Sequence, residues 1–143
     1  MEPRVSIITL GVADLKRSYD FYSALGFPSS YTEDQDIVFF QTSGVCVALY
    51  PLTKLAEEVG IELAEGATMA SPVMTLAHNT KQQHQVDEIL EQAVAAGGSL
   101  VKPAQRVFWG GYSGYFKDPD GHYWEVAHAD SWQFNADGSL VIE

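Results

Sequence analysis

The apolar residues of the chain follow two spacings, one typical of strands and one typical of helices, and the same succession occurs twice. Runs rich in β-branched residues predict strands, whereas apolar residues three or four positions apart predict the buried face of a helix. The first half begins with a predicted strand over residues 5–11 and a helix whose apolar positions lie between 15 and 25. Strand-like stretches then lie near 29–32, 37–41 and 45–50, and a short helix is predicted over 52–59.

Local signals define the ends of these two helices. Asp14 precedes the first helix, and its carboxylate can accept the unpaired backbone N–H groups of the first turn. Gly26 and Gly60 follow the two helices, at the position where glycine adopts the left-handed conformation that ends a helix. The main order of elements predicted for the first half is therefore β-α-β-β-β.

The second half of the chain shows the same order after a connection over residues 61–71. A strand is predicted over 72–77, and Thr80 and Gln83 occupy the two polar positions of a capping box at the start of a helix. Gly97 and Gly98 end this helix, since glycine is favoured at that position. The remaining strands are predicted near 99–107, 112–117 and 123–128.

Proline and turn residues refine this second half. Pro103 cannot donate to a strand ladder, so its strand is predicted to be an edge strand or to be bulged. The Asp-Pro-Asp-Gly sequence at 118–121 and the Asn-Ala-Asp-Gly sequence at 135–138 are typical of tight turns. In the tail, Trp132 and Phe134 are expected to pack against the rest of the chain.

The repetition is visible in the residues themselves. Ile7–Gly11 aligns with Val73–Ala77 at an offset of 73 − 7 = 66 residues, and both segments contain Thr followed by Leu. An internal repeat of this kind indicates two copies of one supersecondary unit. We therefore predict an α+β protein, a single domain made of two βαβββ modules at about 5–60 and 72–128 with a C-terminal tail at 129–143.

Composition narrows the classes of partner. The net charge is 8 − 19 = −11, which opposes binding to nucleic acid and is compatible with a cationic ligand or simply with solubility. The apolar runs are too short to cross a bilayer, and the first residues do not resemble a signal peptide, so we expect a cytoplasmic protein without a membrane partner. Cys46 is the only cysteine, which excludes an internal disulfide.

Two motifs stand at opposite ends of the doubled pattern. Residues 10–27 contain Val-x-Asp-Leu-x-x-Ser followed by Phe-Tyr and Leu-Gly, and residues 114–126 contain Phe-x-Asp-Pro-Asp-Gly followed by Glu125. Together they resemble the vicinal-oxygen-chelate superfamily, which includes glyoxalases, bleomycin-resistance proteins and extradiol dioxygenases. The resemblance implies that the two modules form a curved, half-barrel-like sheet around a small-molecule pocket, and that the protein is a homodimer.

Members of that superfamily use a divalent metal in the pocket to hold two adjacent oxygens of the substrate. Carried over to this chain, the four ligand positions of the family fall on Ile7, Ala48, Val73 and Glu125. Three aliphatic side chains cannot donate an electron pair, and a transition metal requires about three protein ligands. We therefore expect no metal and no other cofactor. Strand alternation also places the strand histidines on faces away from Glu125.

The role of Glu125 is open at this point. A carboxylate among aliphatic side chains would have a raised pKa and could act as a general base or acid. It could equally be a remnant held by the hydroxyls of Thr9, Thr75 or Tyr115, or a partner for a cationic ligand. The further candidate substrate-binding residues besides Thr9, Thr75 and Tyr115 are Arg106, Trp109 and Tyr112. The alternative role of the aromatic residues Trp109, Tyr112 and Tyr115 is to fill the core where the two modules meet.

Two functional hypotheses follow from the resemblance. One is a glyoxalase-like enzyme, of the lyase or isomerase type or a dioxygenase relative, in which Glu125 transfers a proton without the family's metal. The other is a non-catalytic protein that sequesters a drug or metabolite, as bleomycin-resistance proteins do. The surviving glutamate favours the first hypothesis, whereas the acidity and the Trp and Tyr content favour the second.

Overall fold

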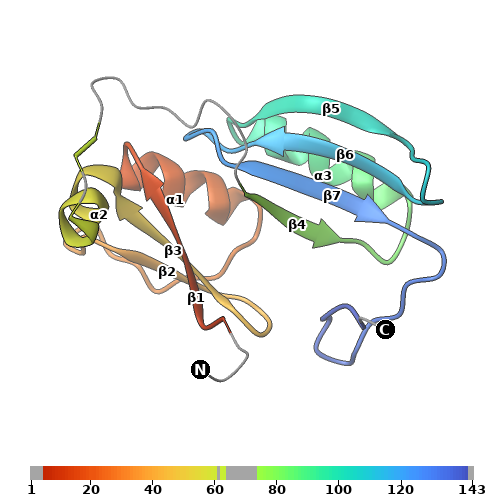
Figure 1. Cartoon of the computed structure of the whole chain (residues 1–143), viewed down its shortest axis with the longest axis horizontal. Helices are drawn as coiled ribbons and strands as arrows, with labels where there is room; N and C mark the ends of the chain where they lie inside the picture. The colour runs from red at the N-terminus through yellow and green to blue at the C-terminus, as the bar shows by residue number, and fades with distance from the viewer. Residues whose placement is uncertain (1–4, 61, 64–73, 142–143) are drawn as a thin grey trace. The chain divides into compact units, whose positions relative to one another are not determined.

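The computed structural model describes residues 5–60, 62–63 and 74–141, which fall into two compact units within residues 1–68 and 69–143. Figure 1 shows the elements of each unit. None of the helices in these ranges is long and apolar enough to span a membrane.

The first unit is a three-stranded mixed sheet with two helices. In the sheet, β1 is parallel to the central strand β3, and β2 is antiparallel to it. The elements in chain order are β1 (Ile7–Val12), α1 (Leu15–Ala24), β2 (Val38–Gln41), β3 (Cys46–Pro51) and α2 (Leu52–Val59).

The core of the first unit lies between the sheet and α1. Leu10, Leu49 and Phe40 are at most 2% exposed. The ring of Phe40 on β2 lies 5.6 Å from that of Tyr22 on α1. Because side chains alternate along a strand, Thr9 points to the other face, where it is exposed. Burial of these large apolar and aromatic side chains is what holds α1 against the sheet.

The predicted ends of both helices are confirmed. The Asp14 carboxylate accepts a hydrogen bond of 2.9 Å from the backbone N–H of Arg17. Gly26 and Gly60 follow α1 and α2 with φ angles of 90° and 78°, in the left-handed region.

The predicted strand near 29–32 is wrong, because these residues belong to no strand. The Ser29 hydroxyl accepts from the backbone N–H of Tyr31, and the Gln35 side-chain oxygen accepts from that of Thr32. These local bonds occupy the backbone donors that a ladder would use.

The second unit is a four-stranded mixed sheet in the order β4-β7-β6-β5, with α3 packed against β5, β6 and β7 (Figure 1). The strand β4 is parallel to β7, and the other neighbours are antiparallel. The elements in chain order are β4 (Thr75–Asn79), α3 (His84–Ala95), β5 (Ser99–Arg106), β6 (Tyr112–Lys117) and β7 (Tyr123–His128). The chain is thus an α+β protein with two βαβββ-like modules in two mixed sheets.

Two details of the second unit bear on the predictions. The strand that contains Pro103 is at the edge of the sheet, and its register shifts before this proline and again across it, so both expectations for it are confirmed. The capping box is wrong: Gln83 makes no side-chain cap bond, and the Thr80 hydroxyl donates to the carbonyl of Gln82. The Gln85 side chain instead accepts from the backbone N–H of Gln82, two positions later than the predicted partner.

Candidate functional site

The sheet of the second unit has two chemically different faces. On β6, a Cβ added to Gly114 would lie 2.6 Å from Leu90 of α3, so this residue faces the helix. Its neighbour Tyr115 therefore faces away from α3, and so does its cross-strand partner Glu125 on β7. We call this second surface the Glu125 face. By register it carries Thr75, Ala77, Tyr115, Lys117, Tyr123 and Glu125.

Glu125 lies in the middle of this face, between Ala77 of β4 and Tyr115 of β6. Burial and a hydrogen bond to the Glu125 carboxylate raise the pKa of Tyr115, so its hydroxyl stays a donor throughout the neutral range. Thr75, Tyr115 and Glu125 are three of the site residues predicted from the sequence, and the structure places all three on one face.

A cation also lies on the Glu125 face. The Lys117 ammonium is 5.5 Å from the centre of the Tyr123 ring, a cation–π distance. Tyr123 is in turn the cross-strand partner of Thr75. The face therefore combines a carboxylate, a phenol donor, an alcohol and an ammonium group, which is a set able to orient a polar small molecule and exchange protons with it.

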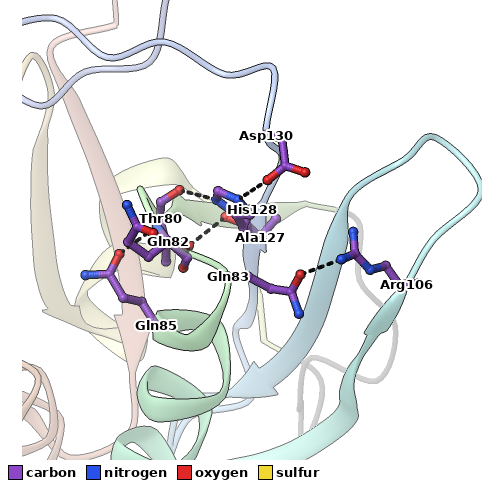
Figure 2. A network of polar contacts seen from close by, with 8 residues as sticks. All are labelled: Thr80, Gln82, Gln83, Gln85, Arg106, Ala127, His128 and Asp130. Carbon is purple, nitrogen blue, oxygen red and sulfur yellow. Dashed lines mark hydrogen bonds and ion pairs between the residues drawn. The ribbon is translucent and has the colours of Figure 1, made fainter.

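Arg106 and Tyr112 lie on the opposite face, toward α3. The Tyr112 hydroxyl donates to the Asp87 carboxylate, 3.1 Å from each oxygen. The Arg106 guanidinium donates to the side-chain oxygen of Gln83 over 2.7 Å, as Figure 2 shows. The structure therefore does not bring these two predicted site residues together with Glu125.

The last two predicted site residues belong to other surroundings. Trp109 lies in the connection between β5 and β6, where its ring stacks on that of Trp132 with centroids 5.7 Å apart. This contact confirms that Trp132 of the tail packs on the body of its unit. Thr9 belongs to the first unit, where it pairs with Ala48.

The residues at the family's ligand positions do not fit a metal. Ile7 and Ala48 are aliphatic, and the third position, Val73, lies outside the described residues. Glu125 has Ala77 and Tyr115 as its cross-strand neighbours. Throughout the described ranges, no group of three or more His, Cys, Asp and Glu side chains is placed to hold a metal ion. A single carboxylate cannot compete with water for a transition metal.

One histidine has a structural role. The Asp118 carboxylate accepts hydrogen bonds from His122 Nδ1 over 2.8 Å and from the backbone N–H groups of Asp120 and His122 over 2.9 Å. Burial by itself lowers the pKa of His122, but the hydrogen bond and charge of Asp118 outweigh it, and the net result is a raised pKa. This pair closes the turn between β6 and β7.

A polar cluster around His128 was not predicted from the sequence. The alternation of β7 correctly places this histidine away from Glu125, but the buried ring makes its own polar contacts with the Thr80 carbonyl and the Asp130 carboxylate (Figure 2). The signal that could have revealed it is the His-x-Asp spacing at the end of the last strand, close to the aromatic residues of the tail.

Two βαβββ-like modules, each with a mixed sheet, define the class of protein to which this fold belongs. The chain is a member of the Glyoxalase/Bleomycin resistance protein/Dioxygenase superfamily, whose family model matches residues 4–126.

Solved structures agree with this assignment. A glyoxalase-related enzyme from Fulvimarina pelagi is 38% identical, with a TM-score of 0.87 and 98% of each chain covered. Protein SA1046 from S. aureus is 26% identical, with a TM-score of 0.76, and the match covers 90% of this chain and 95% of that one. A glyoxalase/bleomycin resistance protein/dioxygenase from Nocardioides is 24% identical, with a TM-score of 0.74, and supports the fold. The match covers 99% of this chain and 91% of that one. No curated protein matches the chain.

Proposed function

We propose that the chain is an enzyme of this family, of lyase or isomerase type, in which Glu125 transfers a proton without the family's metal. The observation that carries the proposal is the cross-strand pairing of Tyr115 with Glu125, on a face that also carries Thr75 and Lys117. The 38% identical protein from Fulvimarina pelagi is described as a glyoxalase-related enzyme, which also favours catalysis.

The proposal includes the surroundings that the family resemblance implies. The Glu125 face would form one wall of an enclosed small-molecule pocket, in a protein that is a homodimer. Enclosure would remove water from Glu125 and strengthen its interaction with a substrate. Thr9 of the first unit remains a proposed substrate-binding residue.

In the reaction, the Glu125 carboxylate would take a proton from a substrate carbon next to a carbonyl group and return it to the same or the neighbouring atom. Tyr115 would hold the carboxylate in place, because its raised pKa keeps the phenol protonated as a hydrogen-bond donor. A well-positioned general base contributes roughly 10²–10⁴-fold to such a proton transfer.

The test follows the exchange of substrate C–H protons in D₂O by NMR, with a panel of small α-hydroxy and α-keto carbonyl compounds. We expect the wild type to catalyse exchange of at least one compound, and Glu125→Gln to slow it at least about 100-fold. Glu88→Gln is the matched control, since it makes the same chemical change at an exposed position of α3. Equal rates in the wild type and Glu125→Gln would refute proton transfer by this residue.

Metal content is the second arm of the test. Protein purified without chelators should contain well under one transition metal per chain by elemental analysis, and chelator treatment should leave the exchange rate unchanged. Near-stoichiometric zinc, nickel, iron or manganese would overturn the metal-free proposal.

A second candidate function is sequestration of a cationic drug or metabolite. It is favoured by the net charge of −11 and by the ammonium of Lys117, which already lies over the Tyr123 ring beside Glu125. Under this alternative no compound of the panel exchanges. Benzyltrimethylammonium would bind instead, and Glu125→Gln would weaken this cation while leaving neutral ligands unaffected.

A further inference from the structure

A cavity of about 460 Å³ lies at the carboxyl ends of the parallel strands β4 and β7, in the second unit. This volume is in the range of small-molecule sites. The cavity does not involve the Glu125 face. Its wall includes Lys81, Gln82, His128, Asp130, Trp132 and Phe134.

His128 presents one particular nitrogen to this cavity. The residue is 9% exposed, and its Nδ1 lies 3.0 Å from the carbonyl oxygen of Thr80, whose own N–H donates to the Ala127 carbonyl over 2.8 Å (Figure 2). Because a carbonyl can only accept, Nδ1 carries a proton, and Nε2 is the atom that meets a ligand. Nε2 donates to a carboxylate only in the imidazolium form, in which both ring nitrogens carry protons. The β4–β7 pairing and this bond hold the imidazole in one orientation.

Nε2 of His128 has an acidic partner in the structure. It lies 3.1 Å from Oδ1 of Asp130, whose side chain is 91% exposed, whereas that of His128 is 11% exposed. Because the Asp130 carboxylate lies mostly in water, its contact with the buried imidazole is weak. The carboxylate of a bound ligand can therefore replace it. Asp130 therefore occupies the position in which the carboxylate of a ligand would meet Nε2.

The rest of the wall suits an aromatic acid. Lys81 supplies a cation, and its ammonium lies 5.8 Å from the centre of the Phe134 ring. Trp132 is held by stacking on Trp109, so one aromatic wall is fixed in place. A planar ring gains from contact with such walls, and a carboxylate gains from paired cationic donors.

We propose that this cavity is a binding site for an aromatic carboxylic acid. The ligand carboxylate accepts a hydrogen bond from Nε2 of the His128 imidazolium in place of the Asp130 carboxylate, and it pairs with Lys81. The ring of the ligand packs between Trp132 and Phe134. The site is independent of the proposed reaction at Glu125, because that residue faces the other side of the sheet.

The first test is calorimetric titration with benzoate at about pH 5.5, which favours the imidazolium form of histidine. Lys81→Met should weaken benzoate about three- to fivefold, as expected for loss of one exposed charge pair. Asp130→Asn should strengthen it by a similar factor, because the competing carboxylate loses its charge. Lys16→Met and Asp20→Asn are matched controls on α1 that make the same charge changes in the first unit, and both should leave the affinity within twofold.

The direction of the affinity change in Asp130→Asn distinguishes a site for a carboxylic acid from a site for a cation. Benzamide and benzylamine carry the same ring with no charge and with a positive charge, and both should bind more weakly than benzoate. Benzoate should also shift the NMR signal of His128 Nε2, and Glu125→Gln should not change its affinity. The proposal is overturned if benzoate does not bind at millimolar concentrations, if Lys81→Met has no effect, or if benzylamine binds best and loses affinity in Asp130→Asn.

Discussion

Gly114 is a position where a single added methyl group should disturb the packing of the second unit. Its hydrogen atoms occupy the space between β6, α3 and the edge strand β5. A Cβ at this site would lie 2.6 Å from the Leu90 side chain, 2.9 Å from the backbone nitrogen of Ala104 and 2.9 Å from the carbonyl oxygen of Lys102. The leucine can rotate, but the two backbone atoms belong to β5 and cannot retreat without loss of its pairing with β6.

The magnitude of the Gly114→Ala effect follows from two opposing contributions. Overpacking of a close-packed site costs roughly 1–3 kcal/mol. Replacement of a strand glycine by alanine returns roughly 0.5–1 kcal/mol by restricting the unfolded chain. The difference spans roughly 0–2.5 kcal/mol. Because two of the close contacts are with backbone atoms, we expect a net loss of about 1–2 kcal/mol in the free energy of unfolding. This lowers the melting temperature by roughly 3–8 °C in a chain of this size.

Urea unfolding followed by circular dichroism measures this loss. The double variant Leu90→Ala/Gly114→Ala tests the cause, because removal of the leucine relieves one of the three contacts and should make the combined loss smaller than the sum of the two single losses. An unchanged or increased unfolding free energy in Gly114→Ala would refute the close approach of β5 and α3. Strict additivity in the double variant would refute the part assigned to Leu90.

Two further predictions concern local electrostatics. Asp14→Ala should lower the unfolding free energy by about 1 kcal/mol, because the N–H of Arg17 loses its 2.9 Å acceptor at the start of α1; an unchanged urea midpoint would contradict this. The raised pKa of His122 means that the folded protein binds its proton more tightly than the unfolded chain does. The resulting stabilisation is complete below the ordinary pKa of 6.5 and declines as the pH rises through the raised pKa. The difference in unfolding free energy between the wild type and His122→Gln should therefore shrink above pH 6.5. A difference that is independent of pH would contradict the prediction.

The elements of this chain could be predicted where neighbouring signals agree. The strands over 112–117 and 123–128 were predicted with the bounds that the structure has, and α2 ends at the predicted glycine. Prediction failed where polar side chains bind the nearby backbone. The hydroxyl of Ser29 and the side-chain amide of Gln35 accept from backbone N–H groups that a strand would have used. Before α3, the geometry of the loop decides which of several glutamines binds the backbone, and the spacing of residues in the sequence does not reveal it.

The site residues were only partly predictable, for a related reason. Tyr112 and Tyr115 are three positions apart in one regular strand, so they cannot share a face, and the period of two already separates them. The side on which Arg106 lies could not be read in this way. Register shifts between Leu100 and Gln105 change the alternation of side chains along β5. Alternation in the sequence therefore does not show on which face of the sheet Arg106 lies.

Pro103 has a consequence for the behaviour of the protein in concentrated solution. An unbroken edge strand is a template on which another chain can add its own strand, the first step toward aggregates. At β5 the missing donor of the proline, the irregular register and the charged side chains of Lys102 and Arg106 interrupt that template. This border of the molecule is therefore protected against growth of an intermolecular sheet.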